Sequence, residues 1–241
     1  MQSNITLEYK MEKGERLEYS TNVHSEQTFK EAGKDPISQA ADTYILMDQI
    51  AKAVNPDGSI NVDVMIKDGK TKAGKEEFPL PTIGQTINMK MQKNGKITGS
   101  SVDMPFNQPP FPEKALNQGD TWTGDSQINV PNRPEPLIMH YNYTLKGFTS
   151  LNGYECAEVS VSCPKTEIDL QDDVKQIISA EGTTYFAYQE GRLIKSQVNT
   201  KTNITAEGME VNSNISITIE LQKTESASSV TPFGESGFII N

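Results

Sequence analysis

Hydrophobic and polar residues alternate along much of this chain with a period of two. The clearest run covers residues 214–221, where isoleucine or leucine occupies every odd position and Ser216, Thr218 and Glu220 lie between them. Residues 59–66 repeat the pattern, and residues 154–163 follow it less strictly. Such alternation is typical of a strand with one buried face and one face in water. The pattern therefore predicts a protein built mainly from antiparallel β-strands.

Short turn sequences separate the predicted strands. They are Asp-Gly, Asn-Gly or Glu-Gly pairs at residues 57–58, 94–95, 152–153, 190–191 and 207–208. Glycine after such a residue favours a tight hairpin turn. The segment 40–54 leads into the first of these turns. Its spacing is compatible with a helix, but its position before a turn and a strand favours one arm of a long hairpin.

Apart from this ambiguous segment, helical spacing is limited to two short segments. In the first, Leu170, Val174, Ile177 and Ile178 are spaced as one face of a helix, with two aspartates near its start and Gly182 beyond its end. Acidic residues at the beginning of a helix and a glycine past its end are both favourable. We therefore expect one helix near 170–180, and a second, shorter one is possible over 112–117.

The chain contains a weak internal repeat. Residues 88–100 align with residues 185–196, and residues 55–64 align with residues 152–161. Each pair reads as a strand, a glycine-containing turn and a second strand, which indicates two similar halves. Chance similarity between ordinary hairpins is the alternative explanation.

These observations predict an antiparallel, strongly curved sheet, a half-barrel or open barrel, formed by two β-meander halves with one or two short helices. The first half covers residues 1–103, and the second covers 137–224 and includes the helix near 170–180. Residues 104–136 connect them and contain seven prolines, too many for a central strand throughout. Residues 225–241 form a flexible tail.

The tail ends in three apolar residues, Phe238, Ile239 and Ile240. An apolar tip after a flexible stretch can dock as an added strand on the same molecule or on a neighbour. The other interpretation is that this end of the chain has no role.

Composition and charge narrow the class of partner. Only 35% of the 241 residues are hydrophobic and the net charge is −10. A nucleic-acid partner is disfavoured, because binding phosphates needs a concentrated positive charge. Uncharged polar residues replace the missing apolar fraction, which is common in β-rich proteins outside the cytoplasm. The sequence has no apolar stretch of the roughly 18–20 residues that a membrane-spanning helix needs.

The first residues, Met1 to Asn4, lack the basic and apolar regions of a signal peptide. Two interpretations remain, a cytosolic protein or an exported protein whose leader has been removed. We expect the second, at the cell surface or in the periplasm.

Cys156 and Cys163 lie seven residues apart in one predicted strand. At this separation they are about 23 Å apart and project from opposite faces. A disulfide requires Cα atoms within about 7 Å, so we expect two free thiols.

Catalytic motifs are incomplete. His24 and His140 belong to no metal-binding motif, so we predict no metal site. Residues 69–75 match part of a phosphate-binding loop, but Glu76 replaces the hydroxyl that would hold magnesium. Residues 53–64 lack both terminal carboxylates of a calcium loop. We therefore expect neither an enzyme nor a cofactor, although acidic side chains that converge in a pocket would still allow a hydrolase.

Aromatic residues are the candidate ligand-binding groups. Trp122, the only tryptophan, follows a Gly-Asp turn, where it either covers one end of the core or forms a platform for a ligand. With it we place Tyr141, Tyr143, Phe186 and Tyr188 in the predicted ligand site.

The segments Leu7–Tyr19, Asn55–Val62, Gly119–Trp122 and Glu190–Leu193 occur in this order. Together they resemble an uncharacterised family of bacterial exported lipoproteins. More distantly, the two-meander pattern is similar to the curved half-barrel of the LolA-like lipoprotein carriers. The resemblance implies export and a membrane tether through a lipidated cysteine ahead of this region, which this chain lacks. It supplies no catalytic residues.

Two functions follow as hypotheses. In the first, the soluble part of a membrane-anchored lipoprotein binds a lipid or acyl chain in the concave face of its sheet. In the alternative, the protein is a structural or interaction module of the cell envelope that acts on a protein partner through its strand edges or its C-terminal tail.

Overall fold

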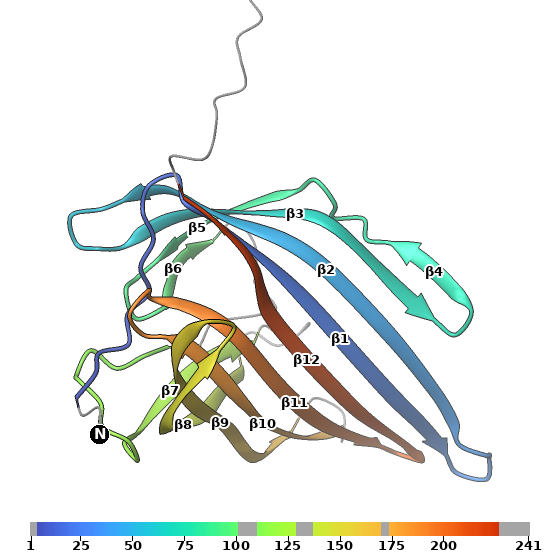
Figure 1. Cartoon of the computed structure of the whole chain (residues 1–241). Coiled ribbons are helices and arrows are strands. Elements are labelled where there is room, and N and C mark those ends of the chain that lie inside the picture. The colour runs from blue at the N-terminus through green and yellow to red at the C-terminus, as the bar shows by residue number, and fades with distance from the viewer. Residues whose placement is uncertain (1–3, 101–109, 129–136, 170–173, 227–241) are drawn as a thin grey trace, which may run out of the picture.

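The computed structural model describes residues 4–100, 110–128, 137–169 and 174–226, which form a single antiparallel sheet (Figure 1). The twelve strands are β1 (Arg16–Glu31), β2 (Ile37–Val54), β3 (Ile60–Ala73), β4 (Glu76–Pro79), β5 (Thr86–Met91), β6 (Ile97–Ser100), β7 (Thr121–Ile128), β8 (Leu137–Leu151), β9 (Tyr154–Asp169), β10 (Lys175–Ala187), β11 (Arg192–Ala206) and β12 (Met209–Glu225). The prediction of a curved antiparallel sheet is confirmed. The residues described contain no helix.

The strand order is β6-β5-β3-β2-β1-β12-β11-β10-β9-β8-β7, with β4 paired to β3 outside this path. Strands close in sequence pair on each side of the sheet, whereas its middle is formed by the first and the last strand. Strands β2–β6 therefore lie on one side of the β1–β12 pair, and strands β7–β11 lie on the other. Strand β7 comes from the predicted connecting segment 104–136 and forms one edge. The domain boundaries themselves stay a prediction.

Both expected helices are wrong wherever the structure describes them. Residues 175–180 belong to strand β10, which pairs with β9 on one side and β11 on the other. Ile178 is half-buried while its neighbour Ile177 is exposed, so the two isoleucines point to opposite faces. Backbone pairing of β10 with a strand on each side stabilises the extended conformation more than the local spacing of apolar residues favours a helix. Residues 112–117 are irregular, and 170–173 lie outside the described residues.

The prediction that residues 40–54 form one arm of a hairpin is confirmed. These residues belong to β2, which pairs with β1 over 37–50 and with β3 over 41–54.

The sheet curves around one of its faces, here called the inner face. A single buried cluster contains Val62 and Met89 from one side of the sheet together with Leu145 and Val159 from the other. Side chains from distant strands can meet in this way only if the sheet bends toward them. Figure 1 shows the same curvature, with β1, β2 and β12 in the middle and the edge strands β6 and β7 turned toward the same side of the molecule.

The N-terminal segment fills one end of the inner face. The backbone N–H of Tyr9 donates to the carbonyl of Lys93 on one side of the sheet, at 2.7 Å, and that of Lys10 donates to Gly191 on the other, at 2.8 Å. Gly191 has a φ of 69°, and a Cβ there would lie 2.6 Å from the carbonyl oxygen of Glu8, so only glycine fits. Residues 5–11 thus join the two sides at this end.

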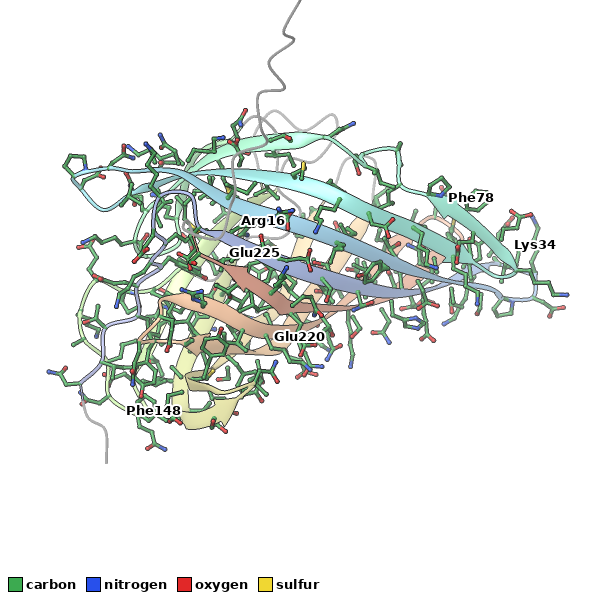
Figure 2. The ribbon with its side chains drawn as sticks, turned by 45° about the horizontal axis from the view of Figure 1, so that its top comes forward. Arg16, Lys34, Phe78, Phe148, Glu220 and Glu225 are labelled. Carbon is green, nitrogen blue, oxygen red and sulfur yellow. The ribbon has the colours of Figure 1, made fainter. Side chains whose placement is uncertain are left out.

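Buried charges hold the middle strands together on the opposite, outer face. The carboxylate of Asp48 on β2 has no exposed surface and forms ion pairs with Arg16 of β1 and Lys67 of β3. Lys67 also pairs with Glu18, and Arg16 lies 3.9 Å from Glu225 of β12. Figure 2 shows Arg16 and Glu225 next to each other on this face. The network therefore links four strands across the middle of the sheet.

Replacing one cation of this network should destabilise the fold. In Arg16→Met, the buried carboxylate of Asp48 loses its closest partner, which we expect to lower the free energy of unfolding by about 3 kcal/mol. Urea unfolding followed by the fluorescence of Trp122 measures this change. The matched control is Lys30→Met on the same strand, which removes an exposed ion pair with Glu210 and should cost less than about 1 kcal/mol. Equal losses in both variants would contradict the role of the network.

Candidate functional site

The inner face continues beyond the core as a band of apolar side chains, here called the trough. It consists of six half-buried residues on four adjacent strands: Val23, Ile45, Val198, Ile215, Ile217 and Ile219. Val23 lies opposite Ile217, and Ile217 lies opposite Val198, so these side chains form a row across β1, β12 and β11. Directly opposite residues in a sheet have Cβ atoms about 4.5–5.5 Å apart, which makes the row continuous.

The trough differs from the core in its burial. Leu17, Tyr19 and Leu221 lie earlier on the same inner face and are buried in the main cluster. Val23, Ile45, Ile215 and Ile217 are neither members of a buried cluster nor packed against one, among the residues described. The sheet supplies a floor of isoleucine and valine here that the core does not cover.

A second, smaller buried cluster borders the trough. It contains Met139, Cys163, Ile168 and Ala180 of β8, β9 and β10. Ile178 and Val198 pack against it, so the trough meets this cluster at β10 and β11. The apolar surface of the trough therefore continues into this cluster on the side of β8–β10.

The inner face becomes more exposed toward the hairpin tips. Phe29 lies opposite both Ile37 and Val211 in the last apolar row. Ile37 is 62% exposed. Met209, two residues beyond Val211 toward the tip of the hairpin, is 49% exposed. Figure 2 places Lys34 of the β1–β2 hairpin at this end of the molecule, and Phe148 at the other. The trough therefore opens at the end that lies away from the core.

The five aromatic residues expected to bind a ligand lie together, mainly in the core. Trp122 stacks on Tyr143, with ring centroids 5.5 Å apart, and its indole N–H donates to the carbonyl of Pro110. Phe186 is completely buried, and Tyr188 is buried against Phe148.

Tyr141 is half-buried and packs against both buried clusters, so it lies between the core and the trough. The assignment of these aromatic residues to a ligand site stays a prediction. Of the trough residues, the sequence identified only Ile215, Ile217 and Ile219 as one face of a strand, from the alternation over 214–221, and it identified none of the six as a site.

Both histidines lie on the outer face. Nδ1 of His24 is 2.6 Å from Oδ1 of Asp42, and Nδ1 of His140 is 2.7 Å from Oδ1 of Asp125. The hydrogen bond to Asp42 raises the pKa of His24. His24 and Asp42 line a hollow of about 390 Å³, together with Lys70.

No cluster of three or more histidine, cysteine or acidic residues suited to a metal ion occurs within the described ranges. The C-terminal residues Phe238, Ile239 and Ile240 lie outside those ranges.

The two thiols are free and buried, as the sequence predicts. Cys163 belongs to the cluster beside the trough, whereas Cys156 lies in the main core. Burial raises the pKa of Cys156 to about 11 and also raises that of Cys163. Both side chains are therefore neutral near pH 7.

No helix long and apolar enough to cross a membrane occurs in the described part of the chain. No protein-family model matches the sequence, and no curated protein is similar to it. The resemblance to an exported lipoprotein family thus stays a prediction.

One of the similar solved structures shares the fold. A lipovitellin structure, described as showing lipid–protein interactions, superposes with a TM-score of 0.53 and 10% sequence identity, over 92% of this chain and 26% of that one. The chain thus spans about a quarter of lipovitellin, and at this identity the likeness shows the fold alone.

Two further structures match more loosely. They are DynF from the dynemicin biosynthesis pathway of Micromonospora chersina and a LolA superfamily protein from Nitrosomonas europaea. DynF has a TM-score of 0.25 and 7% identity, over 91% of this chain and 85% of DynF. The LolA superfamily protein has a TM-score of 0.18 and 10% identity, over 85% and 86% of the two chains. At such TM-scores neither carries an argument.

The buried thiols should resist alkylation in the folded protein. With a pKa of about 11, only about one Cys156 thiol in a thousand is ionised at pH 8, and the thiolate is the reactive form. We expect iodoacetamide to modify Cys156 at least 100-fold more slowly in buffer than in concentrated urea, with the rate rising about tenfold per pH unit between pH 8 and 10. Peptide mass spectrometry follows each cysteine separately. Equal rates in buffer and in urea would show that the thiol is exposed.

Proposed function

We propose that this protein is a non-enzymatic binding protein that holds a hydrophobic ligand, such as a lipid or an acyl chain, on the inner face of its sheet. The observation that carries the proposal is the trough, whose apolar side chains face inward but stay half-buried. Covering apolar surface is favourable by about 25 cal/mol per Å², so a hydrophobic ligand gains affinity by lying there. The likeness in fold to lipovitellin, whose structure is described by its lipid–protein interactions, supports this function.

The regular pairing of the strands favours a preformed ligand site and not a poorly packed part of the core. Val23, Ile217 and Val198 lie on long, regularly paired strands, and the register of β1, β12 and β11 is unbroken there. A site on rigid strands is already formed before the ligand arrives, which is usual for small-molecule sites.

We further propose that the protein works outside the cytoplasm as the soluble part of a membrane-anchored lipoprotein. The polar, acidic composition of its surface and the resemblance to exported lipoproteins support this location. Cys156 and Cys163 are both buried in β9, so a lipid anchor would need a cysteine that precedes the printed sequence. Fractionation of cells that express the protein from its own gene tests the location.

A charge placed in the trough should abolish ligand binding. In Ile217→Glu, a carboxylate replaces an inward apolar side chain in the middle of the trough. We expect the Kd for a fluorescent long-chain monoacylglycerol to rise at least tenfold, about 1.4 kcal/mol, in titrations of delipidated protein. The matched control is Ser216→Glu, which adds the same charge to the adjacent, exposed position on the outer face. We expect this control to bind the monoacylglycerol with the same Kd as the protein without a substitution.

Thermal unfolding of both variants separates lost binding from lost folding. If Ile217→Glu does not fold, Ile217→Ser gives the same comparison with a smaller change. Delipidated protein that binds no long-chain probe at all would exclude the proposed function. Equal binding by the Ile217 and Ser216 variants would exclude the trough as its site.

A further inference from the structure

The inner face of the central strands carries no charged side chain between the core and the row of Phe29; Glu31, which has the same parity on β1, lies beyond that row, opposite Met209. The inward positions are the odd-numbered residues over 21–29 of β1, 37–45 of β2 and 211–219 of β12, and the even-numbered residues over 196–204 of β11. All these residues are described, and none of them is Asp, Glu, Lys, Arg or His. The charged residues of these strand segments therefore all lie on the outer face.

The same strands are charged on the outer face. His24 and Glu26 of β1 alternate with the inward residues, as do Asp42 of β2 and Lys201 of β11. The lack of charge is thus a property of the inner face and not of this part of the sequence.

The inner face is not apolar throughout. Thr21, Ser25, Thr43 and Thr200 occupy inward positions among the trough residues, and one row consists only of uncharged polar residues. Gln27 lies opposite Gln39 on one side and Ser213 on the other, and Ser213 lies opposite Thr202. This polar row, Gln39–Gln27–Ser213–Thr202, separates the trough from the apolar residues at the hairpin tips. The hydroxyl oxygen of Ser213 is buried and has no hydrogen-bond partner within the described part of the protein.

Such a row has a definite chemical preference. Amides and hydroxyls both donate and accept hydrogen bonds, so they match an ester, an amide or a hydroxyl group. A buried hydroxyl without a partner is unfavourable, and a ligand oxygen or N–H near Ser213 would supply the missing hydrogen bond. A carboxylate or phosphate that contacts the buried hydroxyl of Ser213 would give up part of its water, and no inward residue of these ranges is a cation that could replace it.

We propose that the ligand is a neutral amphiphile, whose acyl chain lies in the trough and whose uncharged polar group contacts the polar row. This assignment rests on the proposed function and names its ligand class. From Gln27 to Thr21, at the inner limit of the trough, six residues of β1 span about 20 Å. One leaflet of a bilayer has a hydrocarbon layer of about 15 Å, so the trough is long enough for a single acyl chain.

The orientation of the ligand follows from the same geometry. The core lies at the inner end of the trough and the exposed Ile37 and Met209 lie at the outer end. The polar row lies near the outer end, where Gln27 and Gln39 are exposed to solvent. The acyl chain therefore points toward the core, and the polar group stays near the opening.

Competition between ligands of equal chain length tests this assignment. Delipidated protein is loaded with a fluorescent monoacylglycerol, which is then displaced by an unlabelled monoacylglycerol, by the corresponding fatty acid at pH 8, or by the corresponding lysophosphatidylglycerol. We expect the neutral compound to displace the probe at concentrations at least tenfold lower than either anion. Equal potency, or a more potent anion, would overturn the assignment of a neutral ligand but leave the hydrophobic site in place. Failure of the monoacylglycerol probe to bind would overturn the neutral ligand, and failure of a fluorescent fatty acid to bind as well would overturn the hydrophobic site.

A variant of the polar row should reverse the preference. In Gln27→Lys, an ammonium group enters the row, and we expect the affinity for the fatty acid to rise at least fivefold while that for monoacylglycerol falls. The matched control is Asn199→Lys, which adds the same charge at an exposed outward position of β11. It should leave the order of the ligands unchanged. The same response in both variants would show that general charge, and not the row, sets the preference. If Gln27→Lys does not fold, Gln39→Lys tests the neighbouring position.

Discussion

The pairing of the first strand with the last is the contact on which the rest of the structure depends. Strands β1 and β12 pair from Arg16 opposite Glu225 to Glu31 opposite Met209, with one irregularity near Glu18. Without this contact the two sides of the chain would be separate sheets, each with an additional open edge. With it, they form one surface broad enough to curve around a common core. The ion pairs of Asp48 and the N-terminal segment then act on a sheet whose two sides already lie together.

The length of the central strands explains why a core and a trough occur on the same face. Strands β1, β2 and β12 contain 16, 18 and 17 residues, about three times the usual length. The N-terminal segment and Phe111 fill the inner face at one end only, where Tyr9 and Phe186 pack together. Alternation continues along the strands past this point, so the apolar face continues beyond the residues that cover it. The trough is thus a consequence of strands that are longer than the core they enclose.

Much of the fold could be predicted from local sequence, but the site could not. Alternation over 214–221 identified β12 and its inward face, and the Asn-Gly and Asp-Gly pairs marked the hairpins. Residues 175–180 were misassigned because Ile177 and Ile178 suit a helix locally, and only pairing on both sides makes them a strand. The contact between β1 and β12 has no local signal, since it joins residues about 200 positions apart. For the same reason, sequence alone directed attention to Trp122 and Phe186, although the trough arises from Val23 and Ile217 on paired strands.

The polar row also bears on why the trough remains open. An apolar face of this size in water would be expected to close on itself or to recruit another apolar surface. Gln27, Gln39 and Ser213 work against both outcomes, because a closed, dry interior would leave their amide and hydroxyl groups without partners. The two glutamines cost little while the face is open, since both are solvated, whereas the buried hydroxyl of Ser213 still lacks a partner. The polar row thus has two effects. It disfavours collapse of the trough, and it offers hydrogen bonds to an uncharged polar group. The same residues therefore stabilise the open state and select the ligand.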